Sequence, residues 1–378
     1  MKNIPFNKPF LIGNEIEYIK EAISTGKISG DGLFTKKASD YFITKFGFKK
    51  PLLTSSCTDA LEMAAILCNI SPGDEVILPS YTFVSTANAF ALRGADLVFA
   101  DSLNDLPNID PEEISRLVTP KTRAVVVVHY GGIACRMDEI KQITDRYGLY
   151  LIEDAAQAID SYYKNKPLGS IGDLAAFSFH ETKNVISGEG GMLNVNRDEM
   201  INRAEIIREK GTNRAAFFRG EIDKYNWVDI GSSFLPSEIT AAFLFAQLEN
   251  LELIQAKRIK LWEKYYTLLS GLENAGFISL LKIPDYAVKN GHLFCILCRS
   301  LGERTALAAF LKQNGILAVF HYLSLHKSPF YNSRYSGKEL VNSDRYSDTL
   351  LRLPLYYELT EDDVEFITDK IKEFYNKI

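Results

Sequence analysis

The chain has 378 residues, of which 46% are hydrophobic and 24% are charged, with a formal net charge of −5. This length and composition are typical of a soluble globular protein, either with two or three domains or with one large domain and a smaller partner. The acidic balance argues against a general nucleic-acid-binding protein, because such proteins neutralise phosphates with a basic surface.

No targeting or membrane segment is predicted, and we expect a cytoplasmic protein. No stretch reaches about 18 consecutive apolar residues, and the N-terminal sequence MKNIPFNKPF has no apolar signal core. The five cysteines are odd in number and scattered, as is typical of reduced thiols. Cys295 and Cys298 form a CxxC pair within a strand-like run, which favours core cysteines over a zinc or redox site. The five histidines form no close ligand cluster, so no metal site is expected.

The N-terminal part of the chain is predicted to be helical around an irregular loop. Amphipathic patterns at 14–24 and 36–46 flank the glycine-containing loop 26–32. A serine and threonine cluster at 54–58 then opens a helix predicted over 59–68. Such a cluster usually caps a helix, but the free N–H groups and the dipole at a helix start also bind anions.

Strands and helices alternate through the next eighty residues. The apolar run at 123–129 is rich in valine, which is typical of a parallel strand buried on both faces. The alternation predicts an α/β fold with a mainly parallel sheet flanked by helices. Strands are predicted at 75–78, 97–100, 123–129 and 149–154, and helices at 81–91, 111–117 and 137–147.

Two strand ends carry residues suited to pyridoxal phosphate (PLP). The stretch LYLIEDAAQ brings Glu153 and Asp154 to the end of one strand, and the run 174–179 ends shortly before Lys183. Open α/β sheets bind ligands at this edge, and a lysine that loses solvation has a lowered pKa and a nucleophilic amine. Because PLP needs a lysine and an acid for its ring nitrogen, the pair predicts PLP chemistry. A helix cap by the carboxylates and a solvated surface lysine are the alternatives.

The C-terminal third is predicted to form a second domain. After a charged helix at 197–209, segment 212–233 is rich in arginine and aromatic residues. It suits either a nucleotide diphosphate, since arginine pairs with phosphate and rings stack on a base, or a subunit interface. Helical periodicity over 236–269 then leads to the small domain. We expect a large domain over 1–251 and a small α+β domain over 252–378.

Several segments resemble the DegT/DnrJ/EryC family of PLP-dependent sugar aminotransferases, and the resemblance runs from about residue 5 to the C-terminal end. It implies an aspartate-aminotransferase-like fold, a homodimer, and amination of a nucleotide-linked keto-sugar by L-glutamate. The segments are TSSCTDALEMA (54–64), PSYTFVSTANAF (79–90), VHYGG (128–132), IEDAAQ (152–157) and SFHETKN (178–184).

Four further segments are most similar to family members that aminate dTDP-4-keto-6-deoxy-D-glucose at C4. Such members serve polysaccharide biosynthesis, including enterobacterial common antigen and O-antigen. Another 4-keto or 3-keto nucleotide sugar is the alternative. The segments are IREKGTNR (207–214), FFRGEIDKYNW (217–227), DIGSSF (229–234) and AVFHYLSLH (318–326).

The resemblance implies a role for single residues. Lys183 would carry PLP and move the proton, and Asp154 would keep the ring nitrogen protonated. Ser233 would reach the cofactor phosphate of the partner subunit, although many family members have a longer asparagine near this position. The other implied cofactor contacts are Thr58, Asp59 and Ser178 to the phosphate, Gln157 to the phenolic oxygen, and Phe83 beside the ring. The candidate substrate ligands are Arg208, Lys210, Arg214, Arg219 and His321.

Two other activities fit a chain of this fold. PLP-dependent sugar dehydratases resemble these aminotransferases but have a histidine where this chain has Lys183. A non-catalytic PLP-binding protein is the second alternative, which the intact set Asp154, Ser178 and Lys183 disfavours. Phe83 has a simpler alternative of its own, which is packing in the core.

Overall fold

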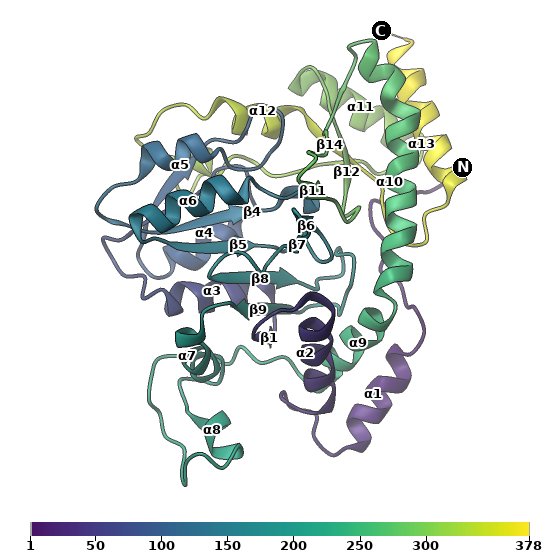
Figure 1. The fold of residues 1–378 in the computed structure, drawn as a ribbon. Helices are drawn as coiled ribbons and strands as arrows, with labels where there is room; N and C mark the ends of the chain where they lie inside the picture. Colours follow the sequence, from purple (N-terminus) through teal and green to yellow (C-terminus); the bar gives the residue numbers. More distant parts are fainter. Residues whose placement is uncertain (1, 378) are drawn as a thin grey trace.

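The computed structural model describes residues 2–377 and has a central seven-stranded sheet (Figure 1). Strand β9 runs against both of its neighbours, and the other six strands of this sheet point the same way. The predicted mainly parallel sheet is therefore confirmed. Its strand order is β1 (Pro51–Thr54), β9 (Gly191–Val195), β8 (Leu174–Ser178), β5 (Tyr150–Asp154), β4 (Thr122–Val128), β2 (Glu75–Pro79) and β3 (Asp96–Ala100).

Helices cover both faces of this sheet and form two separate cores. Val125 and Val127 of β4 belong to one core, whereas Ala124 and Val126 belong to the other. Successive strand residues point to opposite faces, which explains why residues 124–128 are all apolar. The first core includes α1 (Glu15–Ser24), α2 (Leu33–Phe46), α5 (Pro111–Leu117), α6 (Met137–Tyr147) and α9 (Glu238–Glu249). The second includes α3 (Cys57–Leu67), α4 (Val84–Ala91) and α7 (Asp198–Arg208).

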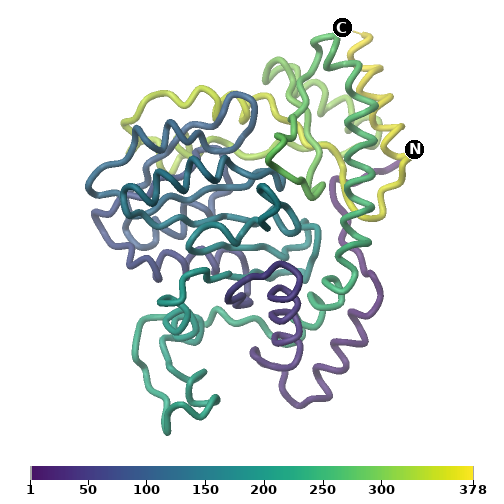
Figure 2. The backbone as a smooth tube through the Cα atoms, in the orientation of Figure 1, coloured from purple at the N-terminus to yellow at the C-terminus, as the bar shows by residue number. Residues whose placement is uncertain are grey.

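The C-terminal part packs around a third core and an antiparallel sheet. Ile4 joins this core and pairs with Ile316, so the N-terminal segment lies beside the C-terminal part of the chain (Figure 2). The division at residue 251 stays a prediction, with the N-terminal segment packing on the C-terminal part. The elements are α10 (Leu251–Asn274), β10 (Ser279–Leu280), β12 (Phe294–Leu297), α11 (Leu301–Gln313), β13 (Val319–Phe320), α12 (Val341–Thr349), β14 (Leu350–Leu353) and α13 (Glu361–Tyr375).

Two predicted helices differ in detail. The helix expected over 81–91 begins at Val84, because Phe83 has extended backbone at the N-cap. The helical pattern of 236–269 is two helices, α9 and α10, which meet at Asn250. The remaining elements are a small sheet of β6 (Tyr162–Tyr163), β7 (Lys166–Pro167) and β11 (Ala287–Val288), the short helix α8 (Arg214–Phe218), and the 3-10 turns η1 (Tyr130–Gly132) and η2 (Leu325–Lys327).

The structure also allows the cysteines, possible metal sites and possible membrane helices to be described. Cys295 and Cys298 are buried free thiols, as expected for core cysteines. Across residues 2–377, no group of three or more His, Cys, Asp or Glu side chains is arranged to hold a metal ion. Over the same residues, no helix combines the length and apolar character needed to cross a membrane.

Candidate active site

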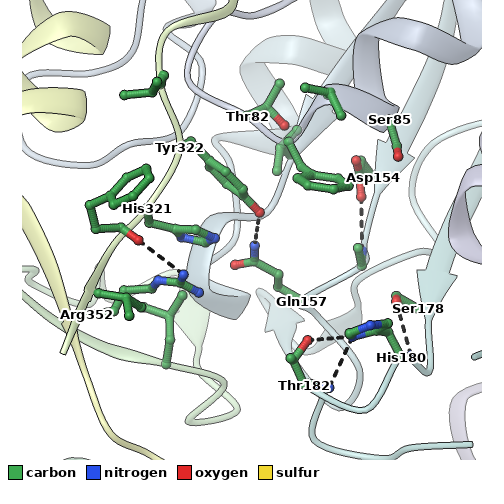
Figure 3. A pocket seen from close by; sticks show the side chains of 18 of the residues that line it. Thr82, Ser85, Asp154, Gln157, Ser178, His180, Thr182, His321, Tyr322 and Arg352 are labelled. Atoms are coloured by element: carbon green, nitrogen blue, oxygen red, sulfur yellow. Dashed lines mark hydrogen bonds between the residues drawn. The ribbon is translucent and has the colours of Figure 1, made fainter. Parts of the chain in front are cut away.

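A pocket of about 1160 Å³ lies where the carboxyl ends of β5 and β8 meet the C-terminal domain (Figure 3). Its large-domain wall comes from the ends of these strands and from the N-terminal turns of α3 and α4. Its other wall comes from the β13–η2 segment, from β14 and from the N-terminal segment at Phe6 and Asn7. The pocket is therefore at the sheet edge where ligands were predicted to bind.

Lys183 lies on this pocket in the loop between β8 and β9. Its backbone N–H donates to the His180 carbonyl at 2.9 Å. The next side chain, Asn184, is buried and donates to Gln255 of α10 at 2.7 Å, while its oxygen pairs with His292 at 2.9 Å. These bonds fix the loop and leave the half-buried Lys183 side chain directed at the pocket.

Among the described residues, the amine of Lys183 is unpaired, and its pKa is lowered. Within residues 2–377 its Nζ has no hydrogen-bond acceptor or carboxylate partner. Burial lowers the pKa of Lys183 below that of an exposed lysine, and the nearby Cys57 and Asp154 oppose part of this shift. A lowered pKa increases the fraction of neutral amine, which is the nucleophilic form.

Asp154 and Glu153 have different roles, although they are adjacent. Asp154 is buried at the end of β5, where it accepts hydrogen bonds from the Thr86 hydroxyl at 2.7 Å and the Ala156 N–H at 3.2 Å. Burial raises the pKa of Asp154, and the bond from Thr86 opposes this. Glu153 points to the other face and accepts the N–H groups of the turn at 169–172. Only Asp154 therefore serves the pocket.

The start of α3 supplies N–H and hydroxyl groups to the same pocket. Ser56 caps the helix by accepting the Asp59 N–H at 3.0 Å, so this predicted phosphate donor is already bonded. The hydroxyls of Thr58 and Ser85 are 2.8 Å apart, and that of Ser178 lines the same pocket. The hydroxyl groups available to a phosphate are therefore those of Thr58, Ser85 and Ser178, of which Ser85 was not predicted. The Asp59 N–H becomes available only when its hydrogen bond to Ser56 breaks.

A glycine allows β9 to approach this helix start. A Cβ on Gly191 would lie 2.3 Å from the Ser56 carbonyl carbon and 2.4 Å from the Cys57 nitrogen. Any larger residue would push the start of α3 away from the strand, and the hydroxyl cluster would move with it. The glycine-rich turn predicted after Lys183 therefore packs against the end of the pocket that the start of α3 lines.

Two further predicted contacts lie on the pocket wall. The side chain of Phe83 is 54% exposed and faces the pocket, so core packing does not explain it. Gln157 accepts the Gly131 N–H at 2.6 Å and donates to the Tyr322 hydroxyl at 2.9 Å (Figure 3). Gln157 lies in a turn rather than on a helix, and its amide is held from both sides.

Together these groups fit PLP. A neutral lysine amine suits its aldehyde, a buried carboxylate suits its ring nitrogen, and an exposed aromatic ring suits its face. N–H and hydroxyl groups at a helix start suit its phosphate. Each part of PLP that needs a protein partner therefore has one in this pocket.

Among the predicted substrate ligands, His321 lies on the pocket wall, and Arg208 does not. His321 is buried, stacks on Tyr322 with ring centroids 3.6 Å apart, and pairs with the Tyr130 hydroxyl at 2.7 Å. Burial lowers the pKa of His321 well below its ordinary value, so the ring is neutral. Arg208 is buried elsewhere and forms a two-oxygen ion pair with Asp31 at 2.6 and 2.7 Å. Its predicted role as a diphosphate ligand is therefore dropped.

The other predicted ligands belong to an exposed projection, residues 210–233, which we call the aromatic arm. It carries α8 and extends away from the central sheet and its helices (Figure 1). Arg219 pairs with Glu205 at 2.9 Å and with Glu221 at 2.7 Å, which leaves it little free donor capacity. Lys210, Arg214 and Ser233 do not line the pocket of this chain, and their roles stay predictions.

Sequence reasoning missed Ser85, Tyr322 and Arg352 on the pocket wall, and Thr86, which donates to Asp154. Ser85, Thr86 and Tyr322 gave no signal, because hydroxyl residues in a helix or a loop are common. Arg352 did give a signal, since it is a charged residue inside the apolar strand sequence LLRLPL. A charged residue within a short apolar strand is seldom part of a core, so it indicates a side chain that faces a ligand or solvent.

Comparisons with known proteins find similar aminotransferases over most of this chain. The model of the DegT/DnrJ/EryC1/StrS aminotransferase family matches residues 10–372. The chain is 32% identical over 382 residues to the spore coat polysaccharide biosynthesis protein SpsC of Bacillus subtilis (strain 168), covering 98% of this chain and 96% of SpsC. It is also similar to the aminotransferase TlmJ from Streptoalloteichus hindustanus, with 27% identity, a TM-score of 0.91 and all of both chains covered.

A third similarity concerns the fold. Helicobacter pylori PseC, an aminotransferase involved in the biosynthesis of pseudoaminic acid, superposes with a TM-score of 0.91 at 23% identity, and all of both chains is covered. The predicted aspartate-aminotransferase-like fold is therefore confirmed.

Proposed function

The chain belongs to the DegT/DnrJ/EryC1/StrS aminotransferase family, and we propose that it moves the amino group of L-glutamate to a nucleotide-linked keto-sugar. The sugar aminotransferase activity and the PLP cofactor follow from the family. The observation that carries the proposal is the meeting of Lys183 and Asp154 in one pocket with the start of α3. The intact lysine also distinguishes the chain from the sugar dehydratases.

Each residue has a defined task in this reaction. PLP, when bound, stabilises the negative charge that develops on the carbon beside the transferred amine. Lys183 holds the cofactor and, once released, its Nζ takes the proton from Cα of the amino donor. Asp154 holds the proton on the ring nitrogen, and Thr86 orients Asp154. Gln157 and Phe83 position the ring, and the start of α3 holds the phosphate.

For the sugar we propose dTDP-4-keto-6-deoxy-D-glucose, which makes the chain a dTDP-4-amino-4,6-dideoxygalactose transaminase. Its products would be dTDP-4-amino-4,6-dideoxy-D-galactose and 2-oxoglutarate. Support comes from similarity in segments other than the PLP motifs, since those motifs serve every substrate. Segment 318–326 lines the pocket through His321, Tyr322 and Leu323. The name of SpsC supports a role in polysaccharide biosynthesis. We propose enterobacterial common antigen or O-antigen as the polysaccharide, and the cytoplasm as the place of the reaction.

The product identifies the sugar directly. We expect the enzyme with PLP and L-glutamate to aminate the 4-keto sugar nucleotide and to leave the 3-keto isomer unchanged. A small H3–H4 coupling in the product NMR spectrum marks an axial C4 amine and the galacto configuration. A large coupling, or amination of the 3-keto isomer alone, contradicts the assignment but leaves the aminotransferase activity intact.

We also propose that two subunits share their active sites through the aromatic arm. Its large side chains Phe218, Trp227 and Val228 are 68%, 80% and 51% exposed. A segment this apolar and this exposed is typical of a subunit interface rich in aromatic residues and arginine. In the dimer the arm would bring Lys210, Arg214 and Ser233 to the partner's pocket.

Mixing two inactive variants tests this arrangement. One subunit carries Lys183→Ala, and the other carries Phe218→Ala with Trp227→Ala in the aromatic arm. A mixed dimer keeps one site with both a lysine and an intact arm, so random mixing should restore about a quarter of the wild-type activity. Activity assays after mixing and light scattering measure the outcome. A monodisperse, active monomer would contradict it.

A further inference from the structure

The pocket contains a cation that the tasks above leave unused. Arg352 lies in the middle of β14, opposite Cys295 of β12 and Val319 of β13. Its neighbours Leu351 and Leu353 are buried in the core of the C-terminal domain. Side chains alternate along a strand, so Arg352 points away from that core and onto the pocket (Figure 3).

The guanidinium of Arg352 is poorly satisfied within the protein. One of its nitrogens donates to the Phe320 carbonyl at 3.2 Å, and its buried Nε has no hydrogen-bond partner. Among residues 2–377, no carboxylate forms an ion pair with it. Since a guanidinium carries five N–H groups, most of its donor capacity is free for a ligand. An unpaired buried N–H is costly, so the site suits an anion.

The protein nevertheless holds this guanidinium in place. The ring of Phe6 lies 4.5 Å from it, measured to the ring centroid. The Phe6 segment is itself fixed, because Ile4 exchanges backbone hydrogen bonds with Gly315 and Leu317, and Asn7 donates to the Glu181 carbonyl at 3.1 Å. The N-terminal segment thus links the strand that carries Arg352 to the loop that carries Lys183.

The position of Arg352 favours one anion over another. Arg352 on β14 and Lys183 in the loop after β8 line the same pocket from its two walls, so a ligand in the pocket can reach both. In an amino acid the α-carboxylate is two bonds from the reacting nitrogen. In a nucleotide sugar aminated at C4, the diphosphate is on the far side of the sugar ring. A planar guanidinium also binds a carboxylate through two parallel N–H groups.

We propose that Arg352 binds the α-carboxylate of the amino donor and so selects an amino acid for the first half of the reaction. This inference rests on the proposed function and names the donor residue of the same site. Phe320 and Phe6 hold the guanidinium, and its free N–H groups receive the carboxylate. The residue would release the 2-oxo acid before the sugar nucleotide enters.

Binding of a non-reactive dicarboxylate tests this role without turnover. Glutarate is titrated into the PLP-loaded enzyme by calorimetry, for the wild type and for Arg352→Gln. We expect the dissociation constant to rise about 10- to 100-fold in the variant. Arg352→Lys keeps the charge but loses the paired N–H geometry, so its constant should lie between the two. Arg304→Gln is the matched control, since Arg304 packs near Phe320 but does not line the pocket.

Two further measurements separate the possible failures. In stopped-flow conversion of the bound PLP by L-glutamate, Arg352→Gln should raise the half-saturating concentration about 10- to 100-fold. Binding of dTDP should be unchanged. The inference would be overturned if Arg352→Gln bound glutarate and glutamate as tightly as the wild type does. It would also be overturned if the variant weakened only the binding of dTDP. If none of the amino acids tested converts PLP in the wild type, the proposed function fails, while the glutarate titration still tests Arg352.

Discussion

Replacement of Lys183 by alanine is expected to lower amino transfer by about 10⁴-fold or more, because one side chain both holds the cofactor and moves the proton. The variant should lose the visible absorbance of lysine-bound PLP. It should fold normally, since within residues 2–377 no group depends on Nζ for a hydrogen bond, and the Lys183 backbone bond to His180 is kept. Absorbance spectra and a coupled assay of 2-oxoglutarate formation measure both effects.

Two controls separate a loss of chemistry from a loss of folding. Lys166→Ala removes an exposed lysine of β7, away from the pocket, and should leave activity and spectrum unchanged. Thermal unfolding of Lys183→Ala should match that of the wild type within a few degrees. Turnover of the alanine variant at the wild-type rate would show that another group performs the chemistry.

The sequence predicted the sheet and its active edge because the relevant signals are local. A strand buried on both faces needs a continuous apolar run, and a strand end needs a turn, so the ends of β5 and β8 could be located. Parallel strands place their carboxyl ends at one edge, which brought Asp154 and Lys183 together in the prediction. The structure places both residues on the predicted pocket.

The remaining site residues depend on contacts between segments far apart in the chain. Arg208 was a candidate phosphate ligand until its partner, Asp31, was known, and these residues are 177 positions apart. The partnership of Gln157 with Tyr322 spans 165 positions. No periodicity or spacing in the sequence reports such pairs, so a basic residue in a loop looks the same whether it is free or already paired.

Asp154→Asn tests the second catalytic group with almost no change in shape. The amide oxygen can still accept the Ala156 N–H, and the Thr86 hydroxyl can turn to accept from the new amide, since Thr82 lies 2.8 Å from it on the other side. We therefore expect a folded protein that binds PLP. The conversion of PLP by L-glutamate should slow by about 10²- to 10⁴-fold, because the ring nitrogen loses the charge that keeps it protonated.

The same substitution should also move the titration of Lys183. Asp154 opposes the effect of burial on that amine, so without its negative charge the pKa of Lys183 falls further. The pH at which apoenzyme attaches PLP most rapidly should therefore shift downward in Asp154→Asn, as stopped-flow absorbance can show. Asp160→Asn is the matched control, since it neutralises a carboxylate six residues on that pairs with Tyr162 outside the pocket. Unchanged half-reaction rates and an unchanged pH profile in Asp154→Asn would mean that Asp154 only caps the turn after β5.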